Sequence, residues 1–246
     1  FNVIDANNDW DSSSIRKMIG CSYSIAIAKE NDNGIKRDHL YRVKSIFERL
    51  NVIINQKKDD FTNNELLVLE IYWNSDYAAL LMNFYDLNKK TGTQNIDDYL
   101  ADALYNHRRA LSLRKQLLTN LASSSEAERK EVQIGIAQSL SNIGGIYYRL
   151  GDTDQAINYQ TLALANFKEL GMKTRALTTM GYIIGIYINK WSRLTPAEID
   201  ASEFQLCCDY AANIGHEYYL DKERNKAKEL FEKSSKLCEI SLTRND

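Results

Sequence analysis

Residues 140–163 read LSNIGGIYYRLGDTDQAINYQTLA, and their spacing predicts two antiparallel helices joined by a tight turn. Small side chains at Gly144, Ala156 and Ala163 stand where the two helices must approach closely. The volume between the helices is supplied by larger apolar residues, which are Leu140, Ile143 and Tyr147. Gly151 follows the first helix and reverses the chain. The stretch therefore predicts a helical hairpin with a close contact at its small residues.

This pattern resembles the tetratricopeptide repeat, in which successive helix pairs stack on one another. Partial copies share its spacing: residues 177–181 repeat the Leu-x-x-Ile-Gly half of the pattern as Leu-x-x-Met-Gly, and residues 103–110 and 214–218 match other parts of it. The resemblance covers about residues 95–242. It implies a right-handed stack of helix pairs whose concave groove holds a peptide or another protein.

The composition favours helices along the whole chain. Its 246 residues include one proline, Pro196, and eleven glycines, whereas sheet proteins of this size need many more turn-forming residues. Apolar residues recur at intervals of three and four between turn residues, which predicts an all-α fold of about nine antiparallel helices, stacked under the resemblance as an α-solenoid. The expected helices are residues 12–30, 36–57, 62–90, 96–121, 126–150, 153–171, 173–191, 195–220 and 223–242.

Helix starts and domain limits are also readable. Thr62 followed by Glu65 is a capping-box pattern at the start of the third helix. Thr195 before Pro196 predicts the start of the eighth. Because no linker rich in proline, serine or glycine divides the chain, we expect residues 12–246 to form a single helical-array domain after a poorly ordered segment at residues 1–11.

Charge, hydropathy and cysteine usage narrow the class of partner and compartment. The 31 basic and 33 acidic residues give a net charge of −2, so no basic excess exists to bind the phosphates of a nucleic acid. No apolar run approaches the ~18 residues of a membrane-spanning helix, so we expect no membrane partner. The four cysteines form no Cys-x-x-Cys pair, which favours a reducing compartment, and we expect the cytoplasm.

The first seven helices, within residues 12–191, also resemble 14-3-3 proteins. Residues 16–23 stand where that family has an Arg-Asn-Leu-Leu-Ser-Val-Ala-Tyr run, residues 76–77 fall in its Gly-Asp-Tyr segment, and Trp191 ends the seventh helix as a tryptophan does there. A phosphate dianion needs paired cationic donors. The family's cationic positions fall here at Ser24, Asn31 and Ala79. The resemblance therefore implies an adaptor with a degraded phosphopeptide pocket, and it leaves a homodimer open.

Catalytic patterns are absent from the sequence. It contains no nucleophile elbow, phosphate-binding loop, dinucleotide fingerprint or zinc-protease motif. Cys208 and His216 are eight residues apart, or about 12 Å along one helix, which is too far for proton transfer. The basic run at residues 107–115 has acidic neighbours and is expected to be a solvated outer face. We therefore expect no enzyme, no cofactor and no metal site.

The repeat register predicts which residues face a partner. The first helix of each pair lines the concave side, and its residues that do not pack within the pair point into the groove. They are Gln138, Ser141, Asn142, Tyr148 and Arg149 on the fifth helix, and Arg175, Thr179 and Tyr182 on the seventh. We expect a non-enzymatic adaptor or scaffold that binds a protein or peptide. A divergent 14-3-3-like adaptor and a ligand- or peptide-sensing regulatory domain of a longer signalling protein remain alternatives.

Overall fold

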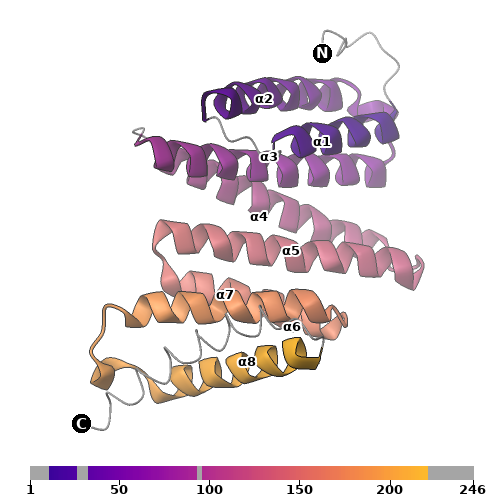
Figure 1. The fold of residues 1–246 in the computed structure, drawn as a ribbon. Helices are drawn as coiled ribbons and strands as arrows, with labels where there is room; N and C mark the ends of the chain where they lie inside the picture. The colour runs from indigo at the N-terminus through magenta and orange to yellow at the C-terminus, as the bar shows by residue number, and fades with distance from the viewer. Residues whose placement is uncertain (1–10, 27–32, 93–95, 221–246) are drawn as a thin grey trace. The chain divides into compact units, whose positions relative to one another are not determined.

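The computed structural model describes residues 11–26, 33–92 and 96–220 (Figure 1). These residues form eight α-helices and two short 3-10 helices, and no strand occurs among them. The α-helices are α1 (Ser12–Ala26), α2 (Asn33–Gln56), α3 (Asn63–Thr91), α4 (Asp97–Asn120), α5 (Glu126–Leu150), α6 (Thr153–Glu169), α7 (Lys173–Trp191) and α8 (Ala201–Leu220). The predicted all-α fold class is confirmed. The ninth predicted helix, and the N-terminal segment apart from Asp11, lie outside the described residues.

Internal contacts divide the chain into two compact units, residues 1–150 and residues 151–246. The first unit contains α1 to α5, and the second contains α6 to α8. That residues 12–246 form one domain stays a prediction.

Successive helices of the first unit run antiparallel. In α3 and α4, the rings of Phe84 and Tyr99 stack with centroids 5.5 Å apart near one end. At the other end, the side-chain amide of Asn120 donates to Asn64 Oδ1 at 2.9 Å. The contact partners of α3 residues therefore come later on α4 as the α3 residues come earlier, so the two helices are antiparallel. Short connections between neighbouring helices predict this arrangement.

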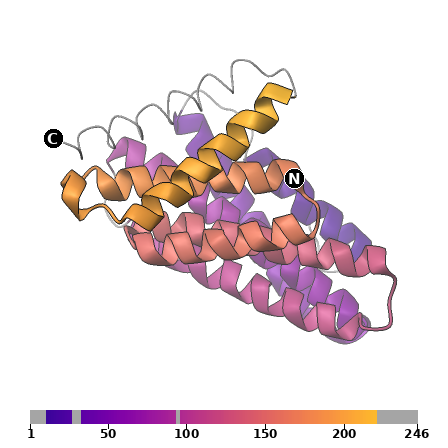
Figure 2. The same ribbon diagram turned by 90° about the horizontal axis from the view of Figure 1, so that it is seen from below.

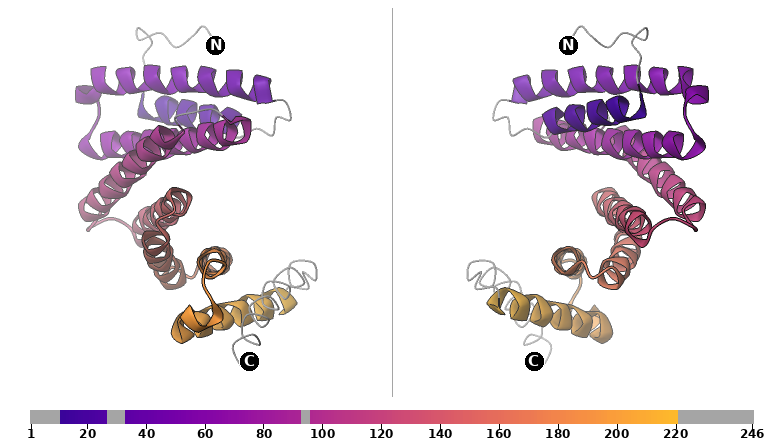
Figure 3. Two further views of the ribbon diagram at one scale, coloured as in Figure 1. Left: turned by 90° about the vertical axis from the view of Figure 1, so that its left-hand side faces the viewer. Right: turned by 90° about the vertical axis from the view of Figure 1, so that its right-hand side faces the viewer.

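The core of the first unit joins α1, α2 and α3. Figure 3 shows α1 between α2 and α3, and all three pairs of these helices pack together. Phe47 is fully buried among their aliphatic side chains, and a buried phenylalanine of this kind contributes roughly 1.5–3 kcal/mol. The indole N–H of Trp73 on α3 donates to the Phe47 carbonyl at 2.8 Å. This bond fixes α2 against the helix that forms one wall of the groove described below.

The second unit is a succession of three helices in which α7 packs against both α6 and α8. Lys190 Nζ contacts Glu203 Oε1 at 2.9 Å near the C-terminal end of α7, and Lys173 pairs with Glu217 at its N-terminal end. These two pairs make α7 and α8 antiparallel. Figure 2 shows α8 running across α7 at an angle.

Helix ends follow side-chain capping. At α3 the Thr62 hydroxyl accepts from the Glu65 backbone N–H, and the Glu65 carboxylate accepts from that of Thr62, so the predicted capping box is confirmed. The eighth helix differs from its predicted start at residue 195. A 3-10 turn covers Pro196–Glu198, and α8 begins at Ala201. The Asp200 carboxylate accepts from the backbone N–H groups of the next turn, which restarts the helix.

The small residues of the repeat pattern are buried. Ala156 and Ala163 on α6 have no exposed surface, and Gly144 on α5 is also buried. Gly151, between these helices, has a φ of +82°. Only glycine adopts this conformation at little cost, which explains its place at the turn.

Candidate interaction groove

A groove of about 650 Å³ opens on the first unit between α3 and α5. The C-terminal half of α4, which packs against both of these helices, forms its base, and the start of α1 borders it. Apolar side chains cover much of its surface. They include Val68 and Ile71 on α3, Leu117 and Leu121 at the base, and Val132 on α5.

Polar contacts fix the three helices around the groove. They are Arg109 with Glu70 (3.1 Å, α4 to α3), Arg149 with Asp86 (3.5 Å, α5 to α3) and Arg108 with the Tyr147 hydroxyl (α4 to α5). The two ion pairs are partly exposed, and such pairs contribute at most about 1 kcal/mol. Their effect is to hold the register of the helices, while the apolar contacts supply the stability.

Arg114 extends from α4 along the groove and is held by α5. Its Nη1 donates to the Ser139 hydroxyl at 2.5 Å. It also lies directly over Gly135, where an added Cβ would stand 2.6 Å from Arg114 Nε. Any larger residue at position 135 would require the guanidinium to move. Glycine at this position therefore makes room for Arg114.

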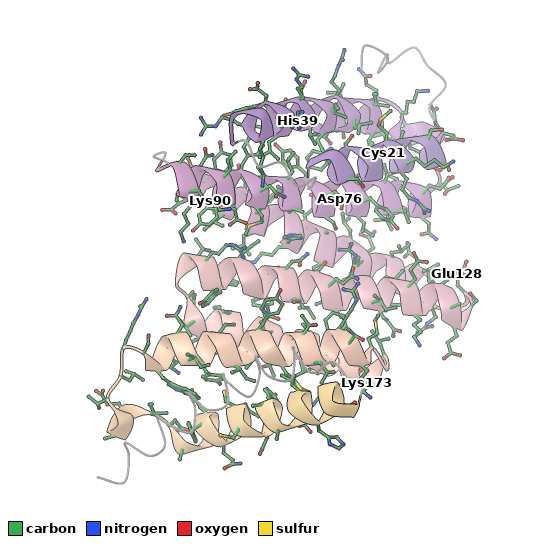
Figure 4. The ribbon with its side chains drawn as sticks, in the orientation of Figure 1. Cys21, His39, Asp76, Lys90, Glu128 and Lys173 are labelled. Atoms are coloured by element: carbon green, nitrogen blue, oxygen red, sulfur yellow. The ribbon has the colours of Figure 1, made fainter. Side chains whose placement is uncertain are left out.

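Two further ionisable groups interact electrostatically with Arg114. They are Asp76 on α3, which Figure 4 labels on its helix, and His107 on α4. Burial raises the pKa of Asp76 to about 7, although the Arg114 charge opposes this shift. Burial lowers the pKa of His107 to about 4, and repulsion by Arg114 adds to the effect. At pH 7 His107 is therefore neutral and Asp76 is only partly ionised, so the Arg114 charge is only partly compensated.

Acidic residues lie at the end of the groove where α3 and α5 begin. Glu65 accepts the Thr62 backbone N–H at 2.9 Å, and Glu128 accepts the Ser125 backbone N–H at 3.1 Å. Both carboxylates also lie at helix N-termini, where the dipole favours negative charge. Figure 4 shows Glu128 at the start of α5. Glu131, one turn further along α5, is exposed on the rim.

Of the residues predicted on the fifth helix, Gln138 lines this groove. Ser141 is half-buried, and Asn142 and Tyr148 are exposed. Arg149 is exposed and paired with Asp86. The structure therefore brings one of the five predicted residues into the groove, and contact of the others with a partner stays a prediction.

The residues predicted on the seventh helix belong to the second unit. The Arg175 guanidinium lies 5.9 Å from the ring centroid of Phe167, and Tyr182 is 58% exposed. Thr179 is 2% exposed, and its hydroxyl donates to the Arg175 carbonyl at 2.8 Å. Thr179 thus has almost no surface for a partner to reach. A separate pocket of about 350 Å³ lies nearby, lined by residues of α6, α7 and α8 and the turn between α6 and α7.

The solvated face predicted for the basic run at residues 107–115 is present at Arg108, Arg109 and Lys115, which are exposed, but not at His107 and Arg114. His107 is 3% exposed, and its Nδ1 has no hydrogen-bond partner among the residues that the structure describes. Arg114 is half-buried in the groove, whereas Lys115 is exposed. The local sequence gives no sign that Arg114 is half-buried, because the cause is its contact with Ser139 and Gly135 on α5.

Within the described residues, no group of three or more histidine, cysteine, aspartate or glutamate side chains could hold a metal ion. Among the helices described, none combines the length and the apolar character needed to cross a membrane.

The first half of the recognised repeat pattern lies on α5, which forms one wall of the groove, and its second half lies on α6. Residues 137–166 match the tetratricopeptide repeat. This match falls on the stretch whose small residues predicted a helical hairpin, and the described residues form a helical array that contains this tetratricopeptide-like stretch. No curated protein sequence matches the chain.

Solved structures with similar helical arrangements include the designed helical repeat protein DHR64, at 14% identity and a TM-score of 0.39, covering 96% of this chain and 100% of that one. A proposed kinesin light chain of Podosopora anserina with nearly identical TPR-like repeats shares 10% identity at a TM-score of 0.38, covering 92% and 96%. A Rap protein complexed with Competence and Sporulation Factor shares 13% identity at a TM-score of 0.23. The match covers 95% of this chain and 100% of that one. Because all three TM-scores are below 0.5, these structures add nothing to the description of the fold given above.

Proposed function

We propose that this protein is a non-enzymatic interaction scaffold and that a segment of a partner protein or peptide binds in the groove between α3 and α5. The observation that carries the proposal is the groove itself, which combines about 650 Å³ of volume with an apolar wall and a charged rim. This combination of an apolar centre and a polar edge is typical of protein-binding surfaces. The tetratricopeptide match at residues 137–166 supports a partner that is itself a protein or peptide.

The groove is flanked by helices, so the expected mode is a segment laid along α3 and α5. Its volume accommodates a few side chains of the partner, and apolar ones fit beside Val68 and Val132. A short segment bound in this way has an affinity in roughly the micromolar range. The exposed predicted residues of α5, Asn142 and Tyr148, are proposed to extend the contact.

The test is selection of binding peptides on the full chain from a displayed library of random 12-residue sequences. Val132→Arg fills the groove with a long charged side chain. Val52→Arg makes the same substitution on α2, at a residue that is 52% exposed and does not line the groove. We expect selected peptides to bind Val132→Arg at least about tenfold more weakly, and Val52→Arg like the unchanged protein. Equal binding to all three proteins would show that the groove is not the site.

The other functional predictions stay proposals. A 14-3-3-like adaptor would bind phosphorylated peptides selectively over their plain counterparts, and we expect no such selectivity, because the positions of the family's cationic residues are Ser24, Asn31 and Ala79 here. A sensor domain would show a melting temperature that rises with a small-molecule or peptide ligand. A cytoplasmic location, the absence of nucleic-acid and membrane partners, and a homodimer likewise stay predictions.

A further inference from the structure

We propose that Arg114 determines the specificity of the groove by binding the side-chain carboxylate of an acidic residue within the partner peptide. The proposal rests on the proposed function, since it names the chemistry that the same groove selects.

The first argument is the number of hydrogen-bond donors that Arg114 has to offer. A guanidinium carries five N–H donors in a planar fork that matches a carboxylate. One nitrogen of Arg114 donates a hydrogen bond to Ser139. Among the described residues, no carboxylate oxygen lies within 4.0 Å of a guanidinium nitrogen of Arg114, so Arg114 forms no ion pair with them. An arginine withdrawn from water is normally paired. The side chain that lines the groove therefore has donors for a ligand.

The second argument is the local charge. Asp76 is the acidic residue that acts on Arg114 through space, and it forms no ion pair with it. Burial raises the pKa of Asp76 to about 7, so its charge is incomplete at neutral pH. The neighbouring His107 is neutral at this pH, so it neither repels nor compensates the charge of Arg114. A carboxylate from a partner would complete the compensation of the guanidinium.

The third argument is that the guanidinium is already in place. The Ser139 hydroxyl holds one nitrogen, and Gly135 permits the side chain to lie flat against α5. A pre-positioned donor loses less conformational freedom when its ligand binds. The cost of ordering this long side chain is therefore met within the free protein.

The rim adds a second feature to the partner. Glu131 is exposed four residues before Gly135 on α5, which is about 6 Å along the helix axis. An extended peptide advances about 3.3 Å per residue. A lysine or arginine two positions from the acidic residue would therefore face Glu131.

The experiment uses an array of synthetic 12-residue peptides with leucine fixed at position 6 on a serine and glycine background. Each other position in turn carries glutamate, glutamine or phosphoserine, and binding of the full chain is measured. We expect glutamate at one position to strengthen binding about tenfold over glutamine. Arg114→Gln should reduce this preference to less than about twofold. Lys115→Gln removes the same charge from the adjacent exposed position and should leave the preference intact.

A second variant keeps the charge of Arg114 but displaces its guanidinium. Gly135→Ala places a methyl group 2.6 Å from the present position of Arg114 Nε, while alanine is favourable within a helix. We expect the glutamate preference to fall at least about threefold. If Arg114→Gln does not fold, an unchanged preference in Gly135→Ala overturns the proposal.

The outcomes separate the two proposals. Peptides that lose binding in Val132→Arg, yet bind equally well with glutamate and glutamine, would overturn the role of Arg114 and leave the scaffold proposal standing. A preference for phosphoserine over glutamate, or a glutamate preference that survives Arg114→Gln, would do the same. If bound peptides do not respond to Val132→Arg, or if no array or library peptide binds at millimolar concentration, both proposals fail.

Discussion

Replacing Asp76 by asparagine should make the stability of the first unit depend steeply on pH, whereas the unchanged protein should show little dependence between pH 4.5 and 6.5. The reason is that two buried groups now oppose each other. The pKa of Asp76 is raised from 3.8 to about 7, and that of His107 is lowered from 6.5 to about 4. Between these values folding binds one proton at Asp76 and releases one at His107.

The signs follow from linkage. For Asp76 the protonated form is favoured in the folded state, so its contribution is complete below pH 3.8 and is lost as the pH rises through 7. For His107 the neutral form is favoured, so its contribution is complete above pH 6.5 and is lost as the pH falls toward 4. Near pH 5.3 the two proton balances cancel. Without the Asp76 carboxyl, His107 alone sets a slope of about 1.2 kcal/mol per pH unit, or about 2 kcal/mol from pH 6.5 to 4.5.

Urea unfolding at several pH values measures this slope. All proteins carry Trp10→Phe and Trp191→Phe, so that the remaining tryptophan, Trp73 on α3, reports on the first unit. Asp102→Asn is the matched control, because this carboxylate is exposed on α4. We expect it to behave like the unchanged protein. Adding His107→Gln to Asp76→Asn should make the profile flat again.

A flat profile for Asp76→Asn would refute this account, as would a stability that rises when the pH falls. Either result would mean that the two groups do not take up and release protons as their burial in the first unit requires.

Three further substitutions test the contacts that shape the helices. Thr62→Ala removes the cap that accepts the Glu65 backbone N–H and should lower the free energy of unfolding of the first unit by about 1 kcal/mol in urea. Trp73→Phe leaves the Phe47 carbonyl without its 2.8 Å donor, and differential scanning calorimetry should show a loss of about 1–3 kcal/mol. Gly151→Ala forces a side chain into a φ of +82°, and a loss of about 1–2 kcal/mol is expected in thermal unfolding followed by circular dichroism; unchanged stability in any variant contradicts the contact behind it.

Much of the fold was predictable because the signals are local. The limits of α5, at residues 126 and 150, agree with the prediction, since apolar period and turn residues lie within the helix and its flanks. The start of α8 was not predicted, because Thr195-Pro196 and Asp200 both offer a helix start, and the chain makes a 3-10 turn at the first and the helix after the second.

The candidate site was predicted less well. Gln138 follows from the repeat register and does line the groove. Arg114 could not be found this way, because the other arginines of its basic run are exposed, while Ser139, which holds it, is 25 residues away on the next helix. Local composition describes a helix face, but the packing of another helix over that face decides which of its charges leave water.

The antiparallel order of α3, α4 and α5 also bears on how quickly this part of the chain folds. The contacts that tie these helices join residues 25 to 63 positions apart. Closing loops of this size costs little entropy compared with pairing distant strands. Proteins rich in such near-neighbour contacts fold in microseconds to milliseconds. Each of these helices can therefore dock on the preceding one as synthesis proceeds, without waiting for the C-terminal half of the chain.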